Sequence, residues 1–342
     1  GWKGVMIAMK ATVYGLREDE RPLFAKEAER FPEIELVLTK EYVTEDSAAL
    51  AEGADAILIT APCTITPALA RRLHGAGVRY ILTRSTGFGH IDRQAIQNYG
   101  IRAANVPAYS LNAVPEFCLL LTLNLLRNFK RESKMLEKKD FSLSGIQGKE
   151  LGAMTVGLFG TGRLGTREAQ LFKAMGCRVL AYNPHPREAA KPYVEYVTKE
   201  TVLREAELIV LQCALNEENR HMINTETIAQ MRDGVYLVNT ARGGLMNFAD
   251  VLDGLKSGKI AGLATDVYDH EETFVRKNCA GMDLGDPVME ELMGMENVIL
   301  TPHIAFFTET AIRDIIHTSL ENLREFARTG GCSNEVYQAK QS

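Results

Sequence analysis

An apolar strand pattern runs directly into a glycine-rich turn in the sequence Thr155-Val156-Gly157-Leu158-Phe159-Gly160-Thr161-Gly162-Arg163-Leu164-Gly165, and a helical pattern follows from Thr166 to Met175. In this setting Gly160 permits the tight turn, Gly162 lets the backbone approach a pyrophosphate, and Gly165 allows the helix and the strand to pack closely. The start of the helix also offers free N–H groups to an anion. The stretch therefore predicts a dinucleotide-binding turn.

Short apolar strands alternate with helical patterns along the rest of the chain, which predicts βαβ units and parallel sheets. The alternation occurs twice, and a long helix predicted from Leu111 to Met135 separates the two runs. Pro115 is compatible with that helix because it falls in the first turn, where backbone N–H groups have no intrahelical partner. The predicted fold class is therefore α/β, with two doubly wound parallel-sheet domains. The predicted strands are Ala11–Tyr14, Ile34–Leu38, Ala54–Ile59, Tyr80–Thr83, Ile101–Val106, Met154–Phe159, Arg178–Tyr182, Glu207–Leu211, Val235–Asn239, Ile260–Val267 and Val298–Leu300, and the other predicted helices are Arg21–Arg30, Thr66–His74, Asp92–Tyr99 and Thr308–Arg328.

Composition and charge exclude several classes of protein. The chain has 342 residues, of which 46% are apolar and 24% charged, and its net charge of -5 opposes a nucleic-acid partner. Its most apolar run, Cys118–Leu126, is far shorter than the roughly 20 residues of a membrane span. Residues Gly1–Ile7 lack the pattern of a secretory signal, and Met9 is the expected natural start. Six widely spaced cysteines without metal-binding spacing indicate reduced thiols, no metal site and a cytoplasmic protein.

The strand after the glycine turn should end on an acidic residue that accepts hydrogen bonds from the adenosine ribose. It ends instead on Asn183, which can still bond to a 2′-hydroxyl but cannot repel a 2′-phosphate. His185 and Arg187 follow, and for Arg187 a solvated surface charge is the alternative to a phosphate ligand. The predicted cofactor is therefore NAD(H), with NADP(H) also admitted.

Three segments that follow predicted strands carry charged or titratable groups, at the sheet edge where open α/β folds bind ligands. Arg242 follows one strand, Asp266 and Glu271 follow a second, and His303 follows a third. Reduction of a 2-keto acid needs a cation for the carboxylate, a proton donor for the developing alkoxide and a carboxylate that keeps the donor protonated. Arg242, His303 and Glu271 supply these three groups, and a guanidinium suits bidentate binding of a carboxylate.

The sequence resembles the D-2-hydroxyacid dehydrogenase family, most closely its D-lactate dehydrogenase branch. The resemblance covers almost the whole chain, from Val13–Glu20 through Asn105–Ser110 and the glycine turn to Thr301–His303. It implies a discontinuous, flavodoxin-like substrate-binding domain of residues 1–108 and 307–342. A Rossmann NAD(P)-binding domain, residues 109–306, would be inserted into it, with the active site in the cleft.

The resemblance also implies roles for single residues. Arg242 would bind the substrate carboxylate and keto group, and His303 would donate the proton during reduction. Glu271, rather than its neighbour Glu272, would hydrogen-bond His303. Asp266 would lie near the nicotinamide and the catalytic histidine.

On the substrate side, the backbone of Thr86 and Gly87 would hold the substrate carboxylate, with Tyr109 beside it, and Phe306 would wall the pocket. On the cofactor side, the expected contacts are Gly160, Thr161, Gly162, Arg163, Leu164, Gly165, Asn183, Cys213, Ala214, Asn219, Thr240, Ala241, Arg242 and Asp266.

Two positions depart from the family pattern. Asn183 stands in place of the usual aspartate, which leaves strict NAD preference open. Gln212-Cys213-Ala214 replaces a common His-Val-Pro after the third Rossmann strand, although Asn219 is available nearby. Neither departure touches the reaction itself.

The sequence thus predicts an NAD(P)-dependent D-2-hydroxyacid dehydrogenase that reduces a 2-keto acid, with pyruvate, which gives D-lactate, as the first substrate to test. A reductase of larger branched or aromatic 2-keto acids is the alternative. A dinucleotide-sensing scaffold, like the co-repressor in the same family, is the alternative of another class. Relatives pair through the nucleotide domain, so a homodimer or higher homo-oligomer is expected. Cys118–Leu121 is a candidate for the interface or for core packing.

Overall fold

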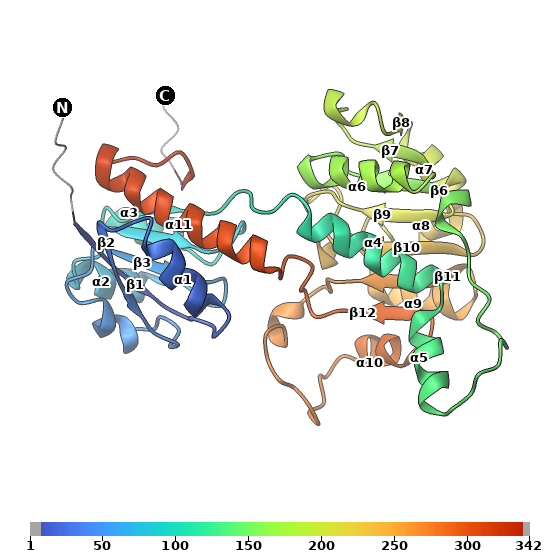
Figure 1. Ribbon diagram of the computed structural model, residues 1–342, viewed down its shortest axis with the longest axis horizontal. Helices are drawn as coiled ribbons and strands as arrows, with labels where there is room; N and C mark the ends of the chain where they lie inside the picture. Colours follow the sequence, from blue (N-terminus) through green and yellow to red (C-terminus); the bar gives the residue numbers. More distant parts are fainter. Residues whose placement is uncertain (1–7, 338–342) are drawn as a thin grey trace. The chain divides into compact units, whose positions relative to one another are not determined.

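The computed structural model describes residues 8–337; residues 338–342 and residues 1–7, where the sequence predicts no secretory signal, lie outside the described part. The chain divides into two compact units, each built on its own sheet (Figure 1). Unit 1 consists of residues 1–110 and 307–342, and unit 2 consists of residues 111–306. No helix within residues 8–337 is both long enough and apolar enough to cross a bilayer.

Unit 1 contains a six-stranded sheet in the order β13-β5-β4-β3-β1-β2. Strands β1 to β5 are parallel and follow the flavodoxin-like order 2-1-3-4-5. The antiparallel edge strand β13 is not predicted from the sequence, because two residues show no periodicity. The strands are β1 (Met9–Val13), β2 (Ile34–Leu38), β3 (Ala56–Ile59), β4 (Tyr80–Thr83), β5 (Arg102–Ala104) and β13 (Glu335–Val336), and the helices are α1 (Glu20–Ala28), α2 (Pro67–Gly75), α3 (Arg93–Asn98) and α11 (Glu309–Thr329).

Unit 2 contains a seven-stranded parallel sheet in the order β12-β11-β10-β9-β6-β7-β8. This is the Rossmann order with one added strand, and the order reverses at β6, where such folds bind dinucleotides. The strands are β6 (Thr155–Phe159), β7 (Arg178–Tyr182), β8 (Glu195–Tyr196), β9 (Leu208–Leu211), β10 (Val235–Asn239), β11 (Ile260–Thr265) and β12 (Val298–Leu300), and the helices are α4 (Ala113–Leu126), α5 (Phe129–Glu137), α6 (Arg163–Ala174), α7 (Lys199–Glu205), α8 (Thr225–Gln230), α9 (Phe248–Lys256) and α10 (Pro287–Gly294).

The single helix predicted from Leu111 to Met135 is wrong. The chain forms α4 and α5 instead, and the break lies at Asn128, whose φ of 56° is left-handed. Asparagine tolerates this conformation better than most residues. The Asn128 side chain also donates to the carbonyl oxygens of Ile146 at 3.3 Å and Gln147 at 3.2 Å. These long-range contacts are invisible to a periodicity argument.

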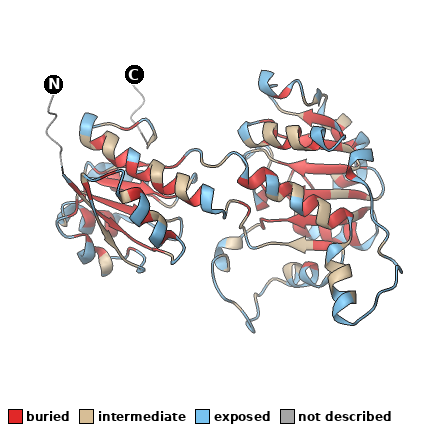
Figure 2. Ribbon diagram, in the orientation of Figure 1, coloured by how far each residue is buried: buried red, intermediate tan, exposed pale blue. Residues whose placement is uncertain are grey.

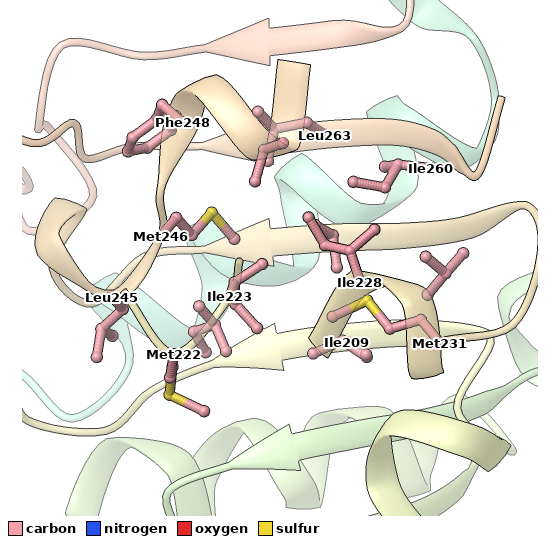
Figure 3. Packing of buried hydrophobic residues seen from close by; sticks show 14 of the residues in the cluster. Ile209, Met222, Ile223, Ile228, Met231, Leu245, Met246, Phe248, Ile260 and Leu263 are labelled. Carbon is pink, nitrogen blue, oxygen red and sulfur yellow. The ribbon is translucent and has the colours of Figure 1, made fainter. Parts of the chain in front are cut away.

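Burial of the sheets anchors the loops that follow them. Strands β3, β4 and β9 are buried at every residue (Figure 2). In unit 2, Ile209, Leu263 and Phe248 pack with Leu245 and Met246 in one apolar cluster (Figure 3). Leu245 and Met246 are fully buried and follow the segment after β10, so packing holds that segment against the sheet.

Candidate active site

The glycine turn joins β6 to α6. Gly160 has a φ of 99°, and a Cβ added there would lie 2.6 Å from the carbonyl oxygen of Gln212. A Cβ at Gly165 would lie 2.1 Å from the carbonyl oxygen of Gly160, so neither position accepts a side chain. A Cβ at Gly162 would meet no atom within 4 Å. The turn therefore leaves open space at the N-terminus of α6, which begins at Arg163, three residues earlier than predicted.

Asn183, directly after β7, holds the glycine turn. Its Oδ1 accepts from the Thr161 N–H at 3.0 Å, and its Nδ2 donates to the carbonyl oxygen of His185 at 2.6 Å. The Tyr196 hydroxyl lies 2.7 Å from Thr161 Oγ1 and accepts from the Arg187 N–H at 2.9 Å. Tyr196 was not singled out from the sequence, because the two-residue strand β8 that carries it has no signature there.

The other expected cofactor contacts follow β9 and β10. Thr240 Oγ1 donates to Gln212 Oε1 at 3.0 Å, and Asn219 Nδ2 donates to the carbonyl oxygen of Ala214 at 2.7 Å. Burial raises the pKa of the Cys213 thiol to about 11, so this thiol is neutral at physiological pH. These residues therefore lie at the carboxyl ends of β9, which neighbours β6, and of β10, the next strand along the sheet.

Arg242 is exposed on the segment after β10. The buried Asn239 side chain donates to the Arg242 carbonyl oxygen at 3.0 Å and accepts from the Ala241 N–H at 3.0 Å. A Cβ at Gly243 would lie 2.0 Å from the carbonyl carbon of Tyr268. The Arg242 segment thus packs, backbone against backbone, on the loop that follows β11.

His303 and Glu271 form a hydrogen-bonded pair between His303 Nδ1 and Glu271 Oε1. The other carboxylate oxygen of Glu271 accepts from the Tyr268 N–H at 2.9 Å. Glu272 lies apart, 74% exposed and near His270. Within residues 8–337, no group bonds to Nε2 of His303, and the side chain is 32% exposed. One ring nitrogen is therefore held by a carboxylate while the other remains available.

Asp266 is buried and fixes the loop that carries His303. Its carboxylate accepts from Thr301 Oγ1 at 2.6 Å, the Ile304 N–H at 2.9 Å and the Ala305 N–H at 2.8 Å. Its carbonyl oxygen accepts from the His303 N–H at 2.8 Å, and His303 has a left-handed φ of 55°. Burial raises the pKa of Asp266, and these hydrogen bonds oppose that shift. Asp266 thus positions both sides of the His303 loop.

In unit 1, the loop after β4 carries Thr86 and Gly87, both exposed. Thr86 Oγ1 donates to the carbonyl oxygen of Val106 at 3.0 Å, and Ser85 Oγ donates to that of Gly87 at 2.7 Å. In the described part of the chain, no acceptor takes the N–H of Thr86 or of Gly87. The loop therefore presents two consecutive N–H groups that an anion could use. Tyr109 is half-buried on the segment after β5.

Phe306 is half-buried in unit 2. The guanidinium carbon of Arg276 lies 5.0 Å from the centre of its ring. This distance is within the range of a cation–π interaction. A cationic side chain therefore lies next to the residue expected to wall the pocket.

Residues 119–305, more than half of the chain, match the family model of the D-isomer specific 2-hydroxyacid dehydrogenase NAD binding domain. The chain belongs to the D-2-hydroxyacid dehydrogenase family. It is 37% identical over 328 residues to an aromatic 2-oxoacid reductase of Clostridium sporogenes, covering 96% of this chain and 99% of the relative. A solved D-lactate dehydrogenase from Treponema pallidum is 35% identical, with a TM-score of 0.91 over 96% of this chain and 100% of that one. A solved D-2-hydroxyisocaproate dehydrogenase is 36% identical, with the same TM-score and coverage.

These findings confirm the predicted family, fold class and enzyme class: this dehydrogenase is an oxidoreductase with an NAD-binding domain.

The dehydrogenase also contains a buried ion pair that the sequence did not reveal. Nε and Nη2 of Arg84 each donate to an oxygen of Glu20 at 3.2 Å, and Nη1 donates to the carbonyl oxygens of Tyr14 at 3.1 Å and Leu58 at 3.3 Å. Arg84 directly precedes the loop of Thr86 and Gly87. The pair therefore joins the ends of β1, β3 and β4 beneath that loop.

Proposed function

We propose that this dehydrogenase uses NAD(H) to reduce a 2-keto acid to a D-2-hydroxy acid, with pyruvate and D-lactate as the first pair to test. The pairing of His303 with Glu271 carries the proposal. The pair follows β12 and β11, Arg242 follows β10, and the glycine turn follows β6. Because the carboxyl ends of parallel strands share one edge of a sheet, all these groups belong to one site.

The residues present fit a dinucleotide, since a cradle without side chains lies at the start of α6. The turn from Gly160 to Gly165 would bind the pyrophosphate, and the bound cofactor supplies the hydride. Arg242 would bind the substrate carboxylate with its planar fork. Protonated His303 would bond to the carbonyl oxygen through Nε2 and transfer that proton as the alkoxide forms. Glu271 would stabilise the imidazolium from the Nδ1 side.

In unit 1, the N–H groups of Thr86 and Gly87 would bind the substrate carboxylate, with Tyr109 beside it. Two consecutive backbone N–H groups without protein acceptors support this assignment. Phe306 would contact the side chain of the substrate. Backbone donors suit this task because they bind an anion without side-chain entropy to lose.

The experiment that tests the proposal follows the oxidation of NADH by absorbance with pyruvate, 2-ketoisocaproate and phenylpyruvate. Fastest turnover of pyruvate supports a D-lactate dehydrogenase. Reaction of the bulky acids alone would indicate that the substrate is a branched or aromatic 2-keto acid. The name of the Clostridium sporogenes relative, an aromatic 2-oxoacid reductase, supports this alternative. Binding of NADH without turnover of any acid would overturn the enzymatic proposal and favour a dinucleotide sensor.

We further propose that NADPH is accepted beside NADH. Asn183 is uncharged and is already bonded to Thr161 and His185, so nothing at this position repels a 2′-phosphate. The Asn183→Asp variant should lower kcat/KM for NADPH relative to NADH by about tenfold or more, because like charges in a binding site cost several kcal/mol. An unchanged ratio in that variant would contradict the proposal.

We also propose that the enzyme forms a homodimer through unit 2. The segment after α5 exposes Phe141 and Leu143 to 79% and 85%, and α5 itself exposes Phe129 and Leu136 to 56% and 61%. Several large apolar side chains exposed to this degree within one stretch of the chain are a feature of protein interfaces.

The stretch Cys118–Leu121 exposes less apolar surface that such an interface could bury. Cys118 and Leu121 pack in the core of unit 2, whereas Leu120 is 51% exposed. Sedimentation velocity should show a dimer for the wild type and a monomer for the double variant Phe141→Ser, Leu143→Ser. A wild-type monomer at assay concentration would overturn the proposal.

A further inference from the structure

A chain of buried amide side chains ends at the loop of Thr86 and Gly87. Asn105, after β5, is 7% exposed, and Asn322, on α11, is 2% exposed. Asn322 Nδ2 donates to the carbonyl oxygen of Asn105 at 2.8 Å, and Asn105 Nδ2 donates to that of Thr86 at 2.7 Å. Because both acceptors are carbonyl oxygens, only the NH₂ end of each amide can make these contacts.

The contact at Thr86 sets the direction of the next N–H group. A trans peptide unit is planar, and its C=O and N–H point in opposite directions. Since the Thr86 oxygen faces Asn105, the Gly87 N–H points away from Asn105. Asn105 is buried and Gly87 is exposed, and no acceptor within residues 8–337 takes that N–H. The amide thus turns a backbone donor away from the buried side of the loop.

We propose that Asn105 is a positioning residue for substrate binding. Its amide holds the peptide between Thr86 and Gly87 so that the Gly87 N–H meets the carboxylate of the 2-keto acid, and Asn322 holds Asn105 from behind. This inference rests on the proposed function of the loop. A neutral amide suits the position, because a carboxylate there could not donate to the Thr86 oxygen and would repel an anionic substrate.

The far end of the same chain offers a matched control. Asn322 Oδ1 accepts from Asn334 Nδ2 at 2.8 Å. Within residues 8–337, the Asn334 side chain makes no hydrogen bond to Thr86 or Gly87, and the Asn334 carbonyl oxygen accepts from the Asn105 N–H at 3.2 Å. Asn334→Ala keeps that backbone bond and the contact between Asn105 and Thr86, and it removes only the side-chain bond to Asn322.

The test compares wild type, Asn105→Asp and Asn334→Ala by kcat, by the KM for NADH and by the KM for pyruvate, or for phenylpyruvate if pyruvate does not react. Asn105→Asp should raise the KM for the 2-keto acid by about 10- to 100-fold at pH 7.5, as expected for a hydrogen bond to a charged group. The KM for NADH should stay within about twofold, since the change lies outside the proposed dinucleotide site. Oxamate, an unreactive analogue of pyruvate, should lose inhibitory strength by the same factor.

The pH dependence separates positioning from general destabilisation. The excess KM of Asn105→Asp over wild type should shrink between pH 7.5 and pH 5, because the introduced carboxyl group can donate to the Thr86 oxygen once it is protonated. If Asn105→Asp does not fold, Asn105→Ser carries the same KM comparison. An unchanged KM for the 2-keto acid, an equal rise in both KM values, or the same rise in Asn334→Ala would overturn the proposal. Wild-type enzyme inactive on every acid would instead overturn the proposed function.

Discussion

The loop that carries His303 in unit 2 is held by two carboxylates, whereas the loop that carries Thr86 and Gly87 in unit 1 is held by an amide. Asp266 and Glu271 make the contacts in unit 2. Asn105 makes them in unit 1. A carboxylate beside an imidazole stabilises its cationic form, but a carboxylate beside an anion-binding loop would oppose the anion. In the proposed mechanism, negative charge therefore lies beside the residue that would transfer a proton, and a neutral amide lies beside the loop that would bind an anion.

The ion pair beneath the unit 1 loop fits the same distinction. Glu20 lies close to that loop, but Arg84 donates to both of its carboxylate oxygens. The side chains of Arg84 and Glu20 are 1% and 2% exposed. The pair therefore adds rigidity beneath the loop without adding net charge, and loss of either partner would leave an uncompensated buried charge.

The largest expected effect concerns His303, the proposed proton donor in unit 2. His303→Ala should lower kcat by about 10²-fold or more, the usual contribution of a positioned acid. The dissociation constant for NADH, measured by fluorescence titration, should stay near the wild-type value. Unchanged turnover would remove His303 from the mechanism. The contacts of Asp266 and Glu271 with its loop would then have no explanation in proton transfer.

The next effect concerns the cation in unit 2. Arg242→Lys should raise the KM for the 2-keto acid by roughly 10- to 100-fold, because lysine keeps the charge but loses the planar, bidentate fork. Steady-state kinetics at saturating NADH measures this effect. A nearly normal KM would contradict the assignment of Arg242 as the carboxylate clamp.

A smaller effect is expected where one carboxylate oxygen becomes an amide. Asp266→Asn should set an NH₂ group against one of the N–H donors of the His303 loop, and stability should fall by roughly 1 to 3 kcal/mol. We expect kcat to fall by about tenfold with an unchanged KM for NADH, as His303 becomes less well oriented. Urea unfolding and steady-state kinetics check the two parts. The matched control is the exposed Asp283→Asn in the same unit, and equal losses in both variants would refute the positioning role.

The last effect, on stability alone, concerns a third carboxyl group in unit 2. Within residues 8–337, neither oxygen of the buried Glu168, on α6, makes a hydrogen bond of normal geometry, and burial raises its pKa well above the ordinary value, although the nearby Cys118 thiol opposes that shift. Because the folded-state pKa lies above the unfolded one, the stabilising contribution of the proton is complete below about pH 4 and is lost as the pH rises. Glu168→Leu should therefore raise the free energy of unfolding at pH 8 by roughly 1 to 3 kcal/mol.

Urea unfolding at pH 5 and pH 8 measures this prediction. Between pH 5 and pH 8, the free energy of unfolding should fall more in the wild type than in the Glu168→Leu variant. Lower stability of the variant at pH 8 would show that Glu168 has a partner that stabilises its ionised form. In that case Glu168 would resemble Asp266 and Glu271, which both have hydrogen-bond partners.

Strands were predicted more accurately than helices. β2, β4, β7, β10 and β12 begin and end at the predicted residues. In β4, which is buried at every residue, the apolar run marks the strand because a strand buried on both faces needs apolar side chains on both. The helix break at Asn128 and the strand β13 were missed. Both depend on contacts between segments distant in the sequence, such as Glu335 of β13 with Ala104 of β5.

The sequence by itself determined the glycine turn, the alternation of strands and helices, and the order of Arg242, Glu271 and His303 at successive strand ends. Each of these is local, because it depends on residue types within one strand, turn or helix. The structure confirms the predicted contact of Glu271 with His303, but only the tertiary structure decided that Asp266 anchors that loop and that the Asn105 amide bonds to the Thr86 carbonyl oxygen. These partners lie 19 or more residues apart along the chain, so their contacts exist only after the sheets have formed.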